Sequence, residues 1–312
     1  MEVVILGCGT SSSVPSVRCI LTRDCKVCIE ASARPDCKNR RLNPSLLVRN
    51  LQTNNNVLVD CGKTFREAAL RIFPEIGISA VHSVVLTHDH ADACLGLDDL
   101  REVQPLAETE DPVTKEVYRN PCEPLKVHCS EDTSQSIRDR FSYLLDEEPP
   151  PVKNGSKEEP FKMAAKLGLA VFDPWERFET DGMQFLPLPV IHGAKYTSFG
   201  FEFGFELGVR FVYISDVNEF PAQTKAYLND VNKPRIDVLV IDALYIVRHH
   251  NTHMSLLEVI ERITTIRPKL TLLTGMSHEF DYYSHYALVA KMGEEKGLRV
   301  AMAYDGIRLA FP

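Results

Sequence analysis

The sequence has no uninterrupted apolar run approaching the roughly 20 residues that a helix needs to span a bilayer. It also has no basic segment and no cleavage-site pattern before the apolar residues Val3 to Leu6, which are typical of a strand. An excess of positive charge is missing too, because the formal net charge is −8. These absences argue against a membrane protein, a secreted protein and a protein that binds nucleic-acid backbones nonspecifically.

Cysteine, in contrast, is not scarce. The nine cysteines are an odd number, and in a reducing compartment thiols serve as metal ligands or small buried residues rather than as disulfides. We therefore expect a cytosolic protein, with the nucleus as the alternative. With 44% hydrophobic and 25% charged residues the chain can bury a sizeable core. Because no low-complexity linker divides it, we predict one domain over residues 1–312.

Strand patterns fill both halves of the chain, and helical periodicity appears between them. Ser45–Val48 with Asn56–Asp60 predicts one hairpin, and Arg299–Tyr304 with Ile307–Ala310 predicts a second around Asp305-Gly306. Strand-rich halves that each end in a strand–helix unit predict an α/β fold of two facing sheets with helices outside. Two polar segments, 105–124 and 146–160, are predicted to be surface insertions on loops.

The segment most informative about chemistry is Val84-Val85-Leu86-Thr87-His88-Asp89-His90-Ala91-Asp92. An apolar strand stops at Thr87, and His88, His90 and Asp92 follow at two-residue spacing. Imidazole and carboxylate groups held at a rigid strand end suit Zn²⁺ or a similar divalent ion. A polar loop with two incidental histidines is the alternative, and it gives no packing reason for this run of residues.

Three further polar residues end apolar strands in the same way. His192 follows Leu186–Ile191, Asp216 follows Phe211–Ser215, and Asp60 follows Val57–Val59. One such residue is more often a capped strand end, but several of them predict a common rim where strand ends meet. The glycine-rich turn Gly7–Ser13 is not a nucleotide fingerprint, because its third glycine is missing and Pro15 stands where a helix should open.

Together these motifs resemble the metallo-β-lactamase superfamily, whose fold is a four-layer αββα sandwich with a metal site at one edge. Within it, the chain is similar to the PhnP-type cyclic phosphodiesterases. That branch shares the early cysteine cluster and a late stretch found here as Leu273-Thr274-Gly275-Met276-Ser277-His278-Glu279-Phe280-Asp281.

The resemblance implies a ligand set and a general acid. His88, His90 and His192 would hold a first metal ion, Asp216 would bridge toward a second, and Asp92 would belong to that second ion. His253 falls where the PhnP branch keeps a histidine proposed to protonate the leaving oxygen, and imidazole suits that role. A surface histidine beside a helix cap is the competing interpretation.

Two positions depart from the family pattern. The final histidine of the motif is Ala93 here, and the last metal-binding histidine of the superfamily falls at Gly275. The second ion would keep only Asp92, Asp216 and water. We expect one tightly bound Zn²⁺. The alternative is a weak, oxygen-rich second site for Zn²⁺, Mn²⁺ or Mg²⁺, helped by Asp89, Asp98 or Asp281.

The early cysteines form a second candidate site. Cys25 and Cys28 make a Cys-x-x-Cys pair, and Cys19 lies six residues before Cys25. Three thiolates and one histidine would form a closed, structural zinc site. By resemblance to the PhnP branch, His278 would be the fourth ligand, with Cys37 as the local competitor and unliganded thiols as the remaining alternative.

The sequence thus predicts a zinc-dependent hydrolase that cleaves a small or cyclic nucleotide-like phosphodiester with metal-bound hydroxide, and in which His253 and Asp92 serve catalysis. Nucleic acid and membranes are not expected partners, and a homodimer stays open. A tRNA 3′-processing nuclease is one rival, although no basic arm is present. A family member that binds metal with weak or no activity is the other, because Ala93 and Gly275 stand where ligands are expected.

Overall fold

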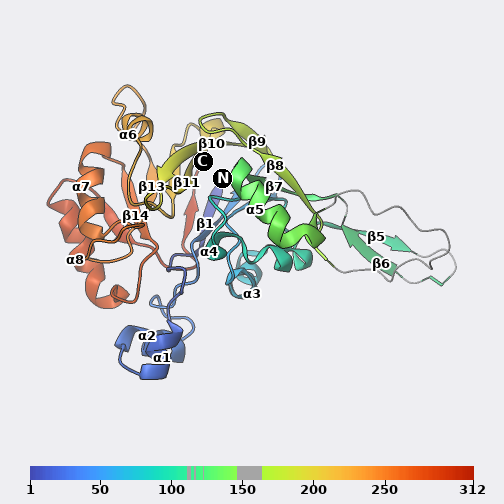
Figure 1. Ribbon diagram of the computed structural model, residues 1–312, viewed down its shortest axis with the longest axis horizontal. Coiled ribbons are helices and arrows are strands. Elements are labelled where there is room, and N and C mark those ends of the chain that lie inside the picture. Colours follow the sequence, from blue (N-terminus) through green and yellow to red (C-terminus); the bar gives the residue numbers. More distant parts are fainter. Residues whose placement is uncertain (111–113, 116, 122, 146–163) are drawn as a thin grey trace.

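Two seven-stranded sheets face each other in the computed structural model, which describes residues 1–110, 114–115, 117–121, 123–145 and 164–312 (Figure 1). The first sheet has the order β16 (Arg308–Ala310), β1 (Glu2–Gly7), β2 (Ser45–Asn50), β3 (Asn55–Val59), β4 (Ser83–Val85), β7 (Leu125–Cys129), β8 (Leu167–Val171). The second has the order β15 (Val300–Met302), β14 (Leu270–Thr274), β13 (Val238–Asp242), β12 (Phe211–Ile214), β11 (Thr197–Phe203), β10 (Met183–Ile191), β9 (Phe178–Thr180).

Helices cover the outer faces, as the predicted αββα sandwich requires. In Figure 1, α7 and α8 lie on one side of the sheets, and α3, α4 and α5 lie on the other. The described helices are α1 (Val17–Thr22), α2 (Lys26–Ala33), α3 (Phe65–Ile76), α4 (Ala91–Cys94), α5 (Glu131–Phe141), α6 (Ala222–Leu228), α7 (Leu256–Ile266) and α8 (Tyr282–Glu294), with 3-10 turns at Leu97–Glu102, Ser142–Leu144 and Phe205–Leu207. None of the described helices is long and apolar enough to cross a bilayer.

The sequence of β1 explains why its sheet lies between two layers. Val3 and Ile5 belong to the apolar core between the sheets, while Val4 and Leu6 pack into the core shared with α3 and α5. Side chains of a strand alternate between its two faces, so an unbroken apolar run is buried on both sides. The helix α7 closes the opposite layer and begins at a capping box, in which Ser255 and Glu258 each bond the other's backbone N–H.

The predicted hairpin at residues 45–60 is confirmed, since β2 and β3 pair antiparallel. The predicted hairpin at the end of the chain is wrong. The strand β15 pairs parallel with β14 in the second sheet, whereas β16 pairs antiparallel with β1 in the first. The turn at Asp305 therefore carries the chain from one sheet to the other. Turn residues specify a reversal, but they do not specify which sheet receives the next strand.

The first predicted insertion is more regular than a loop. Residues 105–124 contain an antiparallel strand pair, β5 (Leu106–Glu110) with β6 (Val117–Pro121), which extends away from the sandwich (Figure 1). The second, 146–160, lies outside the described residues.

The parallel strands determine where the functional groups gather. In the first sheet β3 is parallel to β4, and in the second β12, β13 and β14 are parallel to one another. Strands that run in the same direction end at the same edge of a sheet, so the residues after them share a rim. Asp60, Thr87, Asp216, Asp242 and Gly275 all lie at these ends.

Candidate metal centre

Three histidines from two distant parts of the chain meet at this rim. His88 and His90 occupy the turn between β4 and α4, and His192 directly follows β10. The ring centroids are 4.6 Å apart for His88–His90, 5.3 Å for His88–His192 and 5.1 Å for His90–His192. One ring nitrogen of each histidine lies within 4.8 Å of the other two. His90 and His192 are about 100 residues apart in the sequence, and the fold brings their side chains together at the rim.

Neighbouring groups fix which nitrogen of each buried ring faces the centre. Thr87 Oγ1 donates to Asp60 and lies 2.8 Å from His88 Nδ1, so it accepts the proton of that nitrogen. His192 Nδ1 donates to the carbonyl of Thr252 at 2.7 Å. In both rings Nε2 is therefore the unprotonated nitrogen, which is the state a metal ligand needs.

These residues fit a divalent cation. His88 Nε2 is buried and has no hydrogen-bond partner within the described residues, and a buried polar atom without a partner is costly. Burial lowers the pKa of His88 to about 3 and also lowers the pKa of His192, which keeps both rings neutral. Neutral imidazoles beside a carboxylate form a donor set suited to Zn²⁺.

Asp216 supplies that carboxylate. It follows β12, is buried, and places Oδ1 3.9 Å from His192 Nε2. Burial by itself raises the pKa of Asp216, but the neighbouring histidines, of which His253 carries a charge, lower it below its ordinary value. Asp92 is also buried, in the first turn of α4. Burial, followed by the charge of Asp216, raises the pKa of Asp92 to about 6, so the two carboxyl groups are electrostatically linked.

A fourth histidine joins the centre from the segment between β13 and α7. The rings of His253 and His192 are 4.8 Å apart, and His253 Nδ1 donates to Asp242 Oδ2 at 2.7 Å. Burial by itself lowers the pKa of His253, but Asp242 and then Asp216 raise it to about 9. His253 is thus a part of the site rather than the surface histidine of the competing interpretation.

The two departures from the family pattern lie beside this group. Ala93 is buried in α4, and its short side chain offers no ligand. Gly275 follows β14 with a φ of +68°, and a Cβ there would lie 2.3 Å from Asp242 Oδ1. The Asp242 carboxylate therefore occupies the space into which a side chain at position 275 would project.

The three aspartates considered as helpers of a second ion point to other partners. Asp89 accepts from Ser136 at 2.5 Å and from Arg140 at 3.0 Å, and it also bonds Tyr196. Asp98 pairs with Arg101 within the 3-10 turn Leu97–Glu102. Asp281 caps α8 and accepts from Asn39. None of the three belongs to a group of potential ligand atoms among the described residues.

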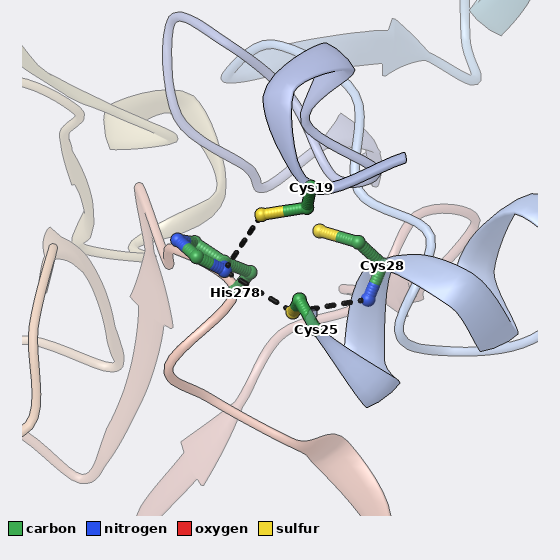
Figure 2. A group of neighbouring side chains, drawn as sticks. All are labelled: Cys19, Cys25, Cys28 and His278. Atoms are coloured by element: carbon green, nitrogen blue, oxygen red, sulfur yellow. Dashed lines mark hydrogen bonds between the residues drawn. The ribbon is translucent and has the colours of Figure 1, made fainter. Parts of the chain in front are cut away.

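The cysteine cluster also forms, with the predicted fourth member. Ligand atoms of Cys19, Cys25, Cys28 and His278 lie within 4.8 Å of one another, and His278 Nδ1 is 3.4 Å from Cys19 Sγ and 3.2 Å from Cys25 Sγ (Figure 2). Cys37 is buried in the same small apolar cluster but is not in this group. Cys25 is the N-cap of α2 and Cys28 lies within that helix, so the pair does not lie on a simple turn.

Three residues in or near the two sites were not identified from the sequence. Asp242 ends the apolar strand β13, which is the same signal that identified Asp216, so the pattern contained it. Arg41 is fully buried and donates to the carbonyls of Ser277 and Phe280. It thereby holds the segment that carries His278. Tyr196, stacked on His90 at 4.7 Å, gave no sequence signal.

Comparison with known proteins agrees with this geometry. A sequence model described as "Beta-lactamase superfamily domain" matches residues 55–276. A solved diphosphatase from the PhnP family is 27% identical, with a TM-score of 0.71 and coverage of 100% of this chain and 98% of that one. Zn²⁺-bound PqqB from Methylobacterium extorquens is 17% identical, with a TM-score of 0.71 and coverage of 99% and 100%. Human tRNase Z, short form, is 13% identical, with a TM-score of 0.57 and full coverage of both chains at 100%.

A curated relative carries a different name. A protein of Porphyromonas gingivalis named "Octanoyltransferase" is 25% identical over 96% of this chain. The match covers 53% of that protein, so the chain spans about half the length of this relative.

Proposed function

The chain belongs to the metallo-β-lactamase superfamily and to its PhnP-like branch, and from that premise we propose that it is a metal-dependent phosphodiesterase. Its substrate would be a small or cyclic nucleotide-like phosphodiester. The observation that carries the proposal is the meeting of His88, His90 and His192 beside Asp216, with Nε2 of both buried rings left free. The diphosphatase activity named for a 27% identical PhnP-family structure supports phosphoryl chemistry.

In this proposal His88, His90, His192 and Asp216 would hold a single Zn²⁺. When bound, such an ion supplies a Lewis acid that lowers the pKa of water and offsets charge on a phosphoryl oxygen. The chain's own contribution begins with Asp60 and Thr87, which orient His88. The carbonyl of Thr252 does the same for His192. Ala93 and Gly275 remove two ligand positions of a second ion, which favours one ion, although His253 also lies with His192 and Asp216 in a group of potential ligand atoms.

His253 is the proton donor of the proposed reaction. Its Nδ1 donates to Asp242, so Nε2 is the atom that would hold the proton for the departing alkoxide oxygen. Asp242 keeps the ring charged and oriented, because its carboxylate is buried and ion-paired with His253. Asp92 lies beside Asp216, and we propose that it positions water or substrate by accepting a hydrogen bond.

The cluster of Cys19, Cys25, Cys28 and His278 would hold a structural Zn²⁺. Four ligands close a tetrahedral site and leave no open position for substrate. The ion would tie α1 and α2, which project from the sandwich in Figure 1, to the segment between β14 and α8.

A metal-binding protein without turnover is the second candidate, because Ala93 and Gly275 remove two ligand positions. We do not extend the octanoyltransferase name to this chain, since half of that relative lies outside the match.

Metal content and turnover together test the proposal. Elemental analysis of the zinc-loaded wild type should find an ion at each of the two clusters, and bis-p-nitrophenyl phosphate should be hydrolysed. The variant His90→Ala should lose one of these ions and the activity, whereas the exposed-site control His249→Ala should keep both. Metal at the cysteines alone would contradict the proposed catalytic centre. Full loading without turnover of any phosphodiester would favour the binding protein.

A further inference from the structure

His90 differs from the other two histidines of the metal centre in how its ring is held. A hydrogen bond at Nδ1 orients the ring of His88, and another orients the ring of His192. The side chain of His90 is the exposed member of the three, and it makes no hydrogen bond within the part of the chain that the structure describes. Because an exposed ring without such a bond is free to change rotamer, a ligand at this position requires another restraint.

Tyr196 supplies a restraint of a different kind. Its ring stacks on that of His90, with 4.7 Å between the centroids and an interplanar angle of 14°. The same ring meets those of His88 and His192 edge-on, at centroid distances of 6.0 Å in both cases. Aromatic rings attract one another in both arrangements, so one tyrosine packs against all three histidines.

The backbone of Tyr196 ties the stacked ring to the turn that follows β10. Its carbonyl accepts from the N–H of His192 at 2.9 Å, and its own N–H donates to the carbonyl of Gly193 at 3.3 Å. His90, in contrast, lies in the turn between β4 and α4. The stack therefore connects the two segments of the chain that carry the histidines.

The ring of Tyr196 is itself held by Asp89, the residue between His88 and His90. The Tyr196 hydroxyl donates to Asp89 Oδ1, and it accepts from the backbone N–H of Asp89 at 3.3 Å. Two hydrogen bonds to one residue fix the position of the hydroxyl group from two directions. The ring that stacks on His90 therefore has little freedom to tilt.

Asp89 is in turn anchored to α5, a helix that carries no member of the histidine centre. Ser136 Oγ donates to Asp89 Oδ2 at 2.5 Å, and Arg140 donates to the same oxygen at 3.0 Å and to the carbonyl of Asp89 at 2.6 Å. Hydrogen bonds to an ionised carboxylate are stronger than those between neutral groups. The restraint on His90 thus extends through Tyr196 and Asp89 to a helix outside the site.

We propose that Tyr196 is the positioning residue for His90 and that Asp89 acts through it. The stacked ring replaces the hydrogen bond that orients each of the other two histidines, and it prearranges His90 for the ion. This inference rests on the metal ion of the proposed function. It concerns the affinity for that ion and does not require the protein to hydrolyse a phosphodiester.

The zinc affinity of the two clusters measures this restraint. Competition with a chromophoric chelator follows the ion at the histidine centre, and the ion at the cysteine cluster is the internal reference. Tyr196→Leu removes the ring and should weaken binding at the histidine centre by roughly 10- to 100-fold, as the loss of a group that orients a ligand does. Tyr196→Phe keeps the stack and loses only the bonds to Asp89, so its affinity should lie between those of wild type and Tyr196→Leu.

Two further variants complete the series. Asp89→Ala leaves the ring of Tyr196 in place without its acceptor, so it should resemble Tyr196→Phe even where Tyr196→Leu does not fold. Tyr143→Leu is the matched control, because the Tyr143 hydroxyl also bonds an aspartate, Asp98, at 3.3 Å. It should keep the wild-type affinity at both clusters.

The pattern of losses distinguishes positioning from a general loss of structure. A loosened fold would weaken both clusters together and would not be rescued by phenylalanine, whereas lost positioning affects the histidine centre alone. Wild-type affinity in Tyr196→Leu and Asp89→Ala, or equal losses at both clusters, overturns the proposal.

Comparison with His90→Ala separates this proposal from the proposed function. If His90→Ala weakens zinc binding but Tyr196→Leu and Asp89→Ala do not, the positioning role fails and the metal centre stands. If the tyrosine series behaves as expected and no phosphodiester is hydrolysed, the phosphodiesterase proposal fails and the positioning role stands. If His90→Ala itself keeps the wild-type affinity, His90 is not a ligand and both proposals are overturned.

Discussion

His253 forms an ion pair with the buried carboxylate of Asp242, in which His253 Nδ1 donates to Asp242 Oδ2 at 2.7 Å. Asp242 ends β13 and His253 precedes α7, so the pair joins two elements at the rim of the second sheet. The other oxygen, Asp242 Oδ1, lies in the space next to Gly275. The Asp242 carboxylate thus orients His253, the proposed general acid. It also occupies the space into which a side chain at position 275 would project.

We expect Asp242→Asn to impair the proton transfer rather than substrate binding. General acid catalysis is needed for a poor leaving group but not for p-nitrophenolate. The variant should lose roughly 10- to 100-fold in kcat on an alkyl phosphodiester and much less on bis-p-nitrophenyl phosphate. His253→Ala should show the same leaving-group dependence, measured by steady-state kinetics on both esters. The control Asp237→Asn lies at the other end of β13 and pairs with Lys269, so it should not discriminate between the esters. Equal losses on both esters would contradict the acid role of the pair.

Cys25→Ala should remove the ion of the cysteine cluster and destabilise the protein. A structural zinc site stabilises the fold by its binding free energy, so the melting temperature should fall by on the order of 10 °C. Calorimetry and elemental analysis measure the two effects. The catalytic ion should be retained, because Cys25 is not among its neighbours. Cys129→Ala, a buried cysteine outside the cluster, is the matched control and should keep both ions. A Cys25→Ala protein as stable as wild type before and after chelation would show that the cluster holds no structural ion.

Gly275→Ala should cost more stability than Gly77→Ala. Both glycines have a left-handed φ, +68° and +67°, so both substitutions carry the same backbone strain. A Cβ at position 77 meets nothing within 4 Å, whereas one at position 275 meets Asp242 Oδ1 at 2.3 Å. We expect a loss of about 1 kcal/mol for Gly77→Ala and at least about 2 kcal/mol for Gly275→Ala in denaturant unfolding. Equal losses would mean that Asp242 moves aside freely. In that case Gly275→His could add a ligand, which we do not expect.

His128→Phe should make the protein less sensitive to acid. His128 lies in β7, stacks on Phe178 at 4.7 Å and has a buried Nε2 without a partner among the described residues. Burial, followed by the charge of Lys126, lowers the pKa of His128 to about 4, from 6.5. Above pH 6.5 the histidine is neutral in both states and has no effect. As the pH falls toward 4 only the unfolded chain gains the proton, so stability is lost.

The variant should retain about 2 kcal/mol more of its stability than wild type does between pH 7 and pH 4.5, roughly as the shift in pKa requires. Urea unfolding at both pH values measures the difference, and the neutral pH serves as the internal reference. A parallel loss in wild type and variant would show that His128 titrates normally in the folded protein.

The sequence determined the layers of the fold and most members of both clusters. Apolar runs such as Val3–Leu6 specify strands buried on both faces, and a polar residue directly after such a run marks the rim. This local rule identified His88, His192 and Asp216, and it also applied to Asp242. The spacing of Cys25 and Cys28 likewise reflects local helix geometry. Each of these signals works because residues near in sequence are necessarily near in space.

Only the tertiary structure determined which strands pair and which side chains contact one another. It separated β15 and β16 into different sheets, and it paired Asp89 with Arg140. It also placed Asp242 in the space beside Gly275. These relations depend on burial and on pairs far apart in the chain. The sequence shows which chemical groups are present, but the packing of the folded chain determines which of them contact one another.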